Sequence, residues 1–473
     1  MKNLTIFKVC LKIILIQVKI RFITFVFAIL LCGVLRGQSV FYDSWHGDLD
    51  VQGNKLTLVF HLSEVFSTMD VPAQGAFELP VKVECENDYH IEVVMEKLGA
   101  SFSGNMLMGN IVGQFTQFGV SFPLVLKRGD IKYNRPQTPV PPFEYNVENV
   151  VFENKEEGAT LAGTLVTPCD ADSSTVVVLM VSGSGLQDRD ETIMQHRPFW
   201  VIADYFAKNG IATLRYDDRG VGESQGDNSK ATSWNYKNDA LAGISYLKGL
   251  GKFSKVGVLG HSEGGLISFM MGEEGAVDFI VSMAGPLLNG TEISLYQQNT
   301  SLLAAGIDLQ SVENYCAAAR KVYNYKKESN SLAKALEGKL VIESADSLLR
   351  SIAPEAELLI APLYANLQEL VSIKYPWMLY FLEYEPMSAL RNVKCPSLLM
   401  FGGKDIQVPY IENIEKYGED VAAMPNVEVV MFENCNHLFQ KAVTGSVSEY
   451  VVIEETISPE VLEQMVKWIK TNN

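Results

Sequence analysis

Several short runs between residues 39 and 134 carry apolar side chains at every second position. Leu56, Leu58, Phe60 and Leu62 show this pattern most clearly, and a period of two is typical of a strand with one buried face. Similar runs lie at 91–95 and 120–126, and glycines that suggest breaks between strands lie at Gly104, Gly109 and Gly113. We therefore predict a small antiparallel β-domain over residues 39–134.

A proline-rich segment follows at 135–144 and includes the sequence RPQTPVPP. Proline favours a stiff, extended backbone. The segment is therefore predicted to be a linker between two domains.

Beyond this segment the apolar runs become continuous and alternate with helical stretches at 198–209 and 234–250. Continuous apolar strands are typical of a parallel sheet that helices cover on both faces. The pattern predicts an α/β core over 145–286 and 391–473. Its predicted strands are at 175–181, 211–216, 255–259, 279–283, 397–401 and 427–431.

The alternation of strands and helices stops between residues 287 and 390. Leu332, Leu336 and Leu340 are spaced as on one helix face, and a second helix is expected at 356–370. We predict that residues 287–390 form a helical cap inserted over the sheet.

The first 38 residues differ from the rest of the chain because they contain lysine and arginine but no acidic residue. An apolar run at 22–35 follows the basic part, which predicts a signal peptide cleaved near Gly37 or Gln38. The protein is then expected in the periplasm or outside the cell, although an uncleaved N-terminal membrane anchor is an alternative. The mature body has no further apolar run of membrane length, so we expect it to lie outside the membrane.

The formal net charge of −17 argues against a nucleic-acid partner, because binding to phosphates requires basic surface. The cysteines beyond the leader are odd in number and form no Cys-x-x-Cys pair, which favours buried free thiols and no metal site. These cysteines are Cys85, Cys169, Cys316, Cys395 and Cys435.

The predicted strand 255–259 runs directly into GHSEGG at 260–265. This fits the G-x-S-x-G pattern, in which a serine occupies a sharp turn between a strand and a helix and needs small neighbours. Ser262 is therefore a candidate nucleophile. An ordinary structural turn has the same local pattern, so the partners of Ser262 must decide between the two.

A serine hydroxyl needs a base to become a good nucleophile, and the chain has six histidines. Three lie in the predicted β-domain. His261 should point away from Ser262, and His196, just before a helix start, is expected to be a surface or loop residue. His437 follows the last predicted strand, at the sheet edge where active sites of open parallel sheets form, so it is the candidate base.

An acid must hold the imidazole of the base in the correct tautomer. Asp405, in FGGKDIQVP, directly follows the predicted strand before that of His437. A lone aspartate in a loop is usually a turn residue, but this position makes Asp405 the candidate acid.

Backbone N–H groups are the candidate donors to an oxyanion. One is the N–H of Glu263, at the start of the helix after the turn. The other is expected in SGSGLQDRD at 182–190, from Ser184 or Gly185, and the sequence leaves this choice open. YDDRGVGES at 216–224 is interpreted as a structural turn held by aspartate and arginine side chains.

Together, SGSGLQDRD, YDDRGVGES, GHSEGG, GGKDIQVP and NCNH resemble the α/β-hydrolase superfamily. The resemblance is to bacterial carboxylesterases of the esterase D type, which are related to serine aminopeptidase-like hydrolases, and it covers residues 145–473. It implies a nucleophile at Ser262, an acid at Asp405 and a base at His437, in the family's chain order. The β-domain resembles an N-terminal extension of some of these proteins. Leu186 departs from the family, which often has proline there.

These observations predict a serine carboxylesterase with an α/β-hydrolase fold that acts on a small-molecule ester and needs neither a metal nor an organic cofactor. A serine aminopeptidase or an acyltransferase would use the same triad, and Glu383 and Glu385 resemble an acidic pocket for a substrate amine. A binding protein that kept only the fold is the alternative of another class. The apolar cap residues that favour small or medium apolar esters are Trp377, Leu379, Tyr380 and Phe381.

Overall fold

The computed structural model describes residues 39–51, 54–72, 76–87, 89–304, 306–328 and 376–472. The chain divides into two compact units, Met1–Lys132 and Tyr133–Asn473. The predicted leader at 1–38 and the predicted cap helices around Leu332–Leu340 and 356–370 lie outside the described residues.

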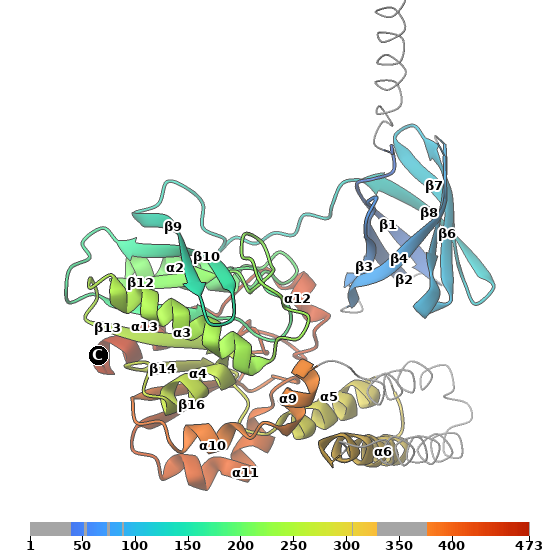
Figure 1. Cartoon of the computed structure of the whole chain (residues 1–473). Coiled ribbons are helices and arrows are strands. Elements are labelled where there is room, and N and C mark those ends of the chain that lie inside the picture. Colours follow the sequence, from blue (N-terminus) through green and yellow to red (C-terminus); the bar gives the residue numbers. More distant parts are fainter. Residues whose placement is uncertain are drawn as a thin grey trace, which may run out of the picture. The chain divides into compact units, whose positions relative to one another are not determined.

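The first unit is a closed antiparallel barrel of eight strands (Figure 1). The apolar positions of the alternating runs, such as Leu58, Phe60 and Ile91, point into its core, which confirms the predicted β-domain. Its elements are β1 (Ser44–Val51), β2 (Asn54–His61), β3 (Ser67–Val71), β4 (Ala76–Glu86), β5 (His90–Met95), the short helix η2 (Glu96–Leu98), β6 (Ala100–Leu107), β7 (Asn110–Gln117) and β8 (Val120–Arg128).

Two of the glycines expected to break strands lie inside strands instead. Gly109 does occupy the turn between β6 and β7, with a φ of 81°, but Gly104 and Gly113 face each other across these strands. A Cβ at Gly113 would collide with the backbone of Ser103 and Gly104. The prediction was wrong at these positions because glycine here permits close strand packing.

The second unit contains an eight-stranded sheet in the order β16-β15-β14-β13-β11-β12-β10-β9. The strands from β11 to β16 pair in parallel, whereas β10 is antiparallel to both β12 and β9. The sequence pattern did not predict β9 and β10. The strands are β9 (Tyr145–Asn154), β10 (Ala159–Pro168), β11 (Val176–Val181), β12 (Ile211–Tyr216), β13 (Lys255–His261), β14 (Ile280–Met283), β15 (Ser397–Gly402) and β16 (Val427–Phe432).

Helices cover both faces of this sheet (Figure 1). Successive side chains of a strand point to opposite faces, so Val177 and Leu179 pack with α3 and α4, while Val178 and Met180 pack with α2 and α13. The helices around the sheet are α2 (Pro198–Lys208), α3 (Ser233–Gly249), α4 (Glu263–Glu273), α11 (Tyr410–Ala422), α12 (Glu449–Val452) and α13 (Pro459–Asn472).

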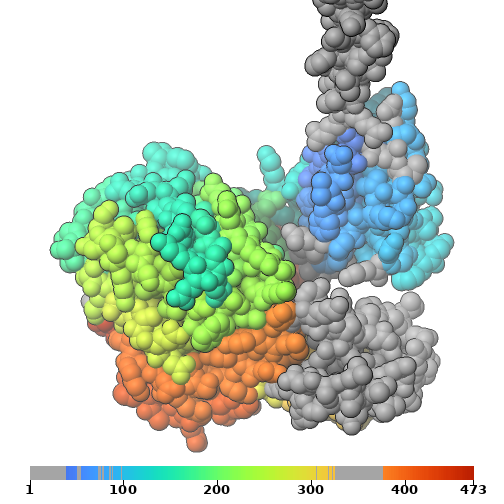
Figure 2. Space-filling view, in the orientation of Figure 1, coloured from blue at the N-terminus to red at the C-terminus, as the bar shows by residue number. Residues whose placement is uncertain are grey.

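Four described helices lie between β14 and β15: α5 (Gly290–Ala304), α6 (Leu309–Glu328), α9 (Pro376–Glu383) and α10 (Pro386–Leu390). Helices α5 and α6 share a separate apolar cluster, which includes Leu302 and Tyr315. Phe381, Met387 and Leu390 instead belong to the main core of the sheet. Accordingly, the segment around α10 and α11 (orange) packs directly against the rest of the second unit (Figure 2).

The predicted linker is attached to the second unit, since the boundary between the units lies just before Tyr133. The guanidinium of Arg135 donates hydrogen bonds to the carbonyl oxygens of Met194 (3.0 Å) and Ile453 (2.9 Å). Gln137 donates to the carbonyl of Ile457 at 2.8 Å and accepts from its N–H at 3.1 Å. The start of the proline-rich segment is therefore part of the α/β fold.

The cysteines with described side chains are free, but they are not uniformly buried. Cys435 is buried, Cys316 and Cys395 are half-buried, and Cys169 is exposed, so the expectation of a buried thiol is wrong for Cys169. The side chain of Cys85 lies outside the described part. Within the described ranges, no helix combines the length and the apolar character needed to cross a membrane.

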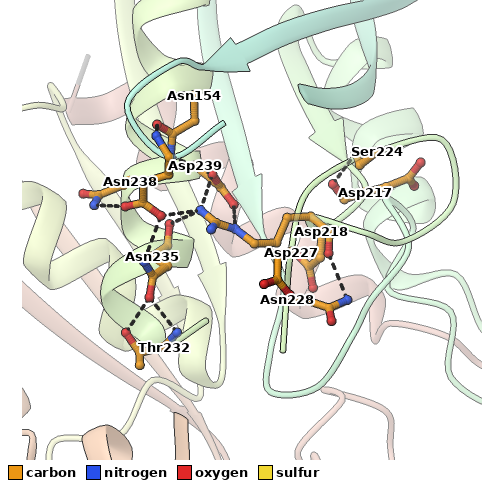
Figure 3. A network of polar contacts seen from close by, with 12 residues as sticks. Asn154, Asp217, Asp218, Ser224, Asp227, Asn228, Thr232, Asn235, Asn238 and Asp239 are labelled. Carbon is orange, nitrogen blue, oxygen red and sulfur yellow. Dashed lines mark hydrogen bonds and ion pairs between the residues drawn. The ribbon is translucent and has the colours of Figure 1, made fainter. Parts of the chain in front are cut away.

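The YDDRGVGES segment forms a polar network at the end of β12 (Figure 3). Buried Arg219 donates to both carboxylate oxygens of Asp239 at 2.7 Å and to Glu157 at 2.8 Å. Asp218 accepts from the Ser182 hydroxyl at 3.2 Å and from the Gln187 N–H at 2.9 Å. The segment therefore has the structural role interpreted from sequence, and it also holds both ends of the loop 182–187.

The carboxyl group of Asp218 should make stability depend on pH. Burial, aided by the charges of Glu263 and Asp239, raises its pKa to about 8 in the folded protein. Because the folded state then binds this proton more tightly than the unfolded state, the contribution of Asp218 to stability falls as pH rises from about 4 to about 8. Asp218→Asn keeps the shape of the protonated acid but has no proton to lose. The difference in Tm between this variant and the wild type should therefore rise by about 3 °C or more, in favour of the variant, from pH 5 to pH 8.

Thermal unfolding of both proteins across this pH range tests the prediction. Asp227→Asn is the matched control, because Asp227 is exposed and hydrogen bonds from Ser229 lower its pKa. The Tm difference between Asp227→Asn and the wild type should not change over this pH range. A Tm difference between Asp218→Asn and the wild type that is constant with pH would contradict the raised pKa.

Candidate active site

Ser262 lies between the end of β13 and the start of α4 with a φ of 53° and a ψ of −116°. Such a backbone costs on the order of 1–3 kcal/mol and persists only where the surroundings enforce it. The Ser262 N–H donates to the Met283 carbonyl at 2.8 Å. A Cβ at Gly260 would collide with the Gly264 carbonyl, and a Cβ at Gly264 with the Val181 carbonyl. The glycines expected beside Ser262 are therefore required for close packing.

Asp405 and His437 are brought together at the carboxyl ends of β15 and β16. The Nδ1 of His437 lies 2.7 Å from the Oδ2 of Asp405, and both side chains are buried. The other carboxylate oxygen of Asp405 accepts from the N–H groups of Gln407 at 2.7 Å and Val408 at 2.9 Å. These two bonds fix the carboxylate, which in turn directs the Nδ1 proton of His437 toward it.

His437 lies beside the turn of Ser262, because it contacts His261, the residue directly before Ser262. The rings of His261 and His437 lie 4.7 Å apart between centroids, and the Nε2 of His261 lies 3.0 Å from the His437 carbonyl oxygen. Among the described residues, no hydrogen bond joins the Ser262 hydroxyl to His437. Hydrogen bonds between a nucleophile and its base are often long without substrate.

The loop after β11 passes next to Ser262 at Gly183. A Cβ at Gly183 would lie 3.2 Å from the Cβ of Ser262, but the Gly183 N–H already donates to Glu191 at 2.7 Å. Ser184 and Gly185, the two residues proposed from sequence, follow it and are exposed. Glu263 is the first residue of α4, where N–H groups have no partner within the helix.

The carboxylate of Glu263 is buried and joins three parts of the second unit. It accepts from the Ser233 hydroxyl of α3 at 2.6 Å and from the indole N–H of Trp377 in α9 at 2.8 Å. Burial raises its pKa, against the hydrogen bonds of Ser233, Trp377 and Ser184. Glu263 therefore ties α3 and α9 to the turn of Ser262, a role that its position in GHSEGG did not reveal.

His196 lies in the loop before α2, as one of the two expectations had it, but it is not at the surface. Its side chain is fully buried, with ring nitrogens 2.8 Å from the Thr456 hydroxyl and 2.9 Å from the Tyr450 carbonyl. Burial lowers its pKa to about 4. Thr456 and Tyr450 are more than 250 residues away in the sequence, so no local pattern indicated these partners.

Glu385, considered above as part of an acidic pocket, accepts from the Asn289 side chain at 2.7 Å. Within the described part of the chain, no three His, Cys, Asp or Glu side chains form a group suited to hold a metal ion.

Two sequence comparisons match known proteins. The family model described as serine aminopeptidase, S33, matches residues 197–323. Esterase EstD of Thermotoga maritima is 26% identical over 331 residues, which cover 69% of this chain and 70% of that protein.

Solved structures similar to this chain include an esterase, Pf2001, of Pyrococcus furiosus (17% identity, 72% of this chain and 99% of that one, TM-score 0.43). Another is Est1E of Butyrivibrio proteoclasticus with ferulic acid bound (14% identity, 68% of this chain and 98% of that one, TM-score 0.38). The parallel sheet, the turn of Ser262 between a strand and a helix, and the two sequence matches together identify the chain as an enzyme of the α/β-hydrolase superfamily.

Proposed function

We propose that the protein is a serine carboxylesterase that hydrolyses small to medium carboxylic esters through an acyl-enzyme on Ser262. The observation that carries the proposal is the buried Asp405–His437 pair, at 2.7 Å, beside the strained turn of Ser262. Ester hydrolysis is also the activity named for EstD, whose match covers 69% of this chain.

In the proposed reaction, His437 acts as the base. Its Nδ1 proton is directed to Asp405, so the Nε2 lone pair accepts the Ser262 proton as the oxygen attacks the ester carbonyl. The backbone N–H of Glu263 and an N–H of Ser184 or Gly185 stabilise the oxyanion. The alcohol leaves with the proton from His437, and water activated by His437 then cleaves the acyl-enzyme.

Helices α5, α6 and α9 would act as the cap that binds the substrate. Trp377 stacks on Phe381 with ring centroids 5.3 Å apart, and Tyr380 stacks on Tyr384 at 5.6 Å. Of these side chains, Trp377, Tyr380 and Tyr384 are half-buried, and they favour an apolar acyl or alcohol group. The leader at 1–38 would direct the enzyme to the periplasm or outside the cell.

The second candidate is a serine aminopeptidase, which the family match at 197–323 favours. It would need a free carboxylate to bind the substrate's amine. Ester hydrolysis is the stronger proposal because EstD, which matches 69% of this chain, is named as an esterase. An acyltransferase would use the same triad and exclude water.

Ser262→Ala should abolish labelling by a fluorophosphonate probe and lower kcat about 10⁶-fold, because the acyl-enzyme cannot form. The assay is a series of p-nitrophenyl esters of increasing acyl length together with aminoacyl p-nitroanilides. Ser245→Ala, at an exposed serine of α3, is the matched control and should keep full activity. A wild type that hydrolyses neither series and leaves Ser262 unlabelled would refute the proposed function.

Asp405→Asn should lower kcat about 10³- to 10⁴-fold with the fold intact. Oδ1 is held by two N–H donors, so the new amide NH₂ would face the Nδ1 of His437. The imidazole would then carry its proton on Nε2 and could not act as base. Steady-state kinetics and circular dichroism check this, with Asp420→Asn at a surface ion pair as control. Wild-type kcat in Asp405→Asn would show that another group is the acid.

A further inference from the structure

The residue directly before Ser262 forms a buried pair with a carboxylate from a different loop. His261 and Glu191 are 4% and 1% exposed. The Nδ1 of His261 lies 2.8 Å from the Oε1 of Glu191, and the same oxygen accepts the Gly183 N–H at 2.7 Å. Glu191 therefore contacts both the turn of Ser262 and the loop proposed to stabilise the oxyanion.

The partners of the His261 ring determine its protonation. The Nε2 lies 3.0 Å from the carbonyl oxygen of His437, and a carbonyl oxygen only accepts, so Nε2 must carry a proton. The Nδ1 faces a carboxylate, which also favours a proton there. Burial acts to lower the pKa of His261, but the charge and hydrogen bond of Glu191, with the His437 carbonyl and Asp405, outweigh it and raise this pKa.

We infer that Glu191 and His261 form a buried ion pair that positions the loops of His437 and Gly183 on the two sides of Ser262. His261 binds the backbone of the proposed base, and Glu191 binds the backbone at the start of the proposed oxyanion loop. Both are positioning residues, because neither would touch the reacting atoms. This role rests on the proposed function of Ser262 and His437.

The conformation of Glu191 supports a specific role. Its φ is 53°, a left-handed backbone that is uncommon for a residue with a long side chain. Asp188 holds this conformation, because its carbonyl accepts the Glu191 N–H at 2.9 Å and its carboxylate accepts the N–H groups of Asp190 and Thr192 at 3.0 Å. The loop thus presents Glu191 to His261 at the expense of local strain.

Glu191→Gln tests the ion pair with little change of shape. The glutamine oxygen can still accept from Gly183 and from the Nδ1 of His261, but the charge that retains the second proton is lost. A neutral ring has one proton and can no longer donate both to the glutamine oxygen and to the His437 carbonyl, so the loop of Gly183 or the loop of His437 would shift. We expect kcat at pH 7.5 to fall about 10- to 100-fold, with KM within about twofold of the wild type.

Glu157→Gln is the matched control. Glu157 also accepts charged and amide donors, from Arg219 (2.8 Å) and Asn238 (2.6 Å), but has no hydrogen bond to Ser262, Asp405 or His437. Its kcat should stay unchanged even if its Tm falls. The Glu191→Gln/His261→Gln double variant should be no slower than His261→Gln alone, because the two residues act as one unit.

Histidine-selective ¹⁵N NMR gives a readout that does not depend on activity. The titratable groups that face His261 are Glu191, His437 and, beyond it, Asp405. In the wild type, both ring nitrogens of His261 should carry a proton at pH 7.5, whereas in Glu191→Gln the ring should be neutral at that pH, because burial then lowers its pKa without the opposing charge. A neutral His261 in the wild type, or a Glu191→Gln variant with wild-type kcat, would overturn the inference. A wild type without esterase activity or Ser262 labelling would instead reject the proposed function, whatever the NMR result.

Discussion

The close approach of helix α4 to the ends of β13 and β11 is the constraint on which the candidate site depends. Gly260 lies against the Gly264 carbonyl, and Gly264 against the Val181 carbonyl, with no space for a side chain at either glycine. This packing holds Ser262 in its strained conformation and sets it beside the loop that follows β11. It also places the unpaired N–H groups at the start of α4 next to the serine.

Buried charged groups hold the loops around this turn, and each has a specific partner. His261 is paired with Glu191. Glu263 accepts from α3 and α9. A buried charge that loses its partner is strongly destabilising, so these groups maintain one arrangement of the loops. The geometry of the site is therefore set by contacts that join the direct neighbours of Ser262, His261 and Glu263, to other loops and helices.

The parts of the fold that could be predicted were those with a local cause. Each predicted strand beyond residue 175 was a continuous apolar run, and Asp405 and His437 each follow such a run. Because the ends of parallel strands meet at one sheet edge, their positions in the chain sufficed to expect Asp405 beside His437. Strand β9 was not predicted, because its sequence alternates between polar and apolar residues instead of forming a continuous apolar run. It lies at the edge of the sheet with one neighbouring strand, so residues such as Val151 are exposed.

The sequence by itself determined the kind of sheet, the β-domain and the candidates Ser262, Asp405 and His437, because periodicity and glycine spacing are local properties of the chain. Only the tertiary structure decided the rest. The burial of His196, the pairing of Gly104 with Gly113 and the contact of Glu191 with His261 depend on partners distant in sequence. The sequence does not show whether the side chain of a histidine or glutamate faces water or a buried partner, and that environment decides its charge and its role.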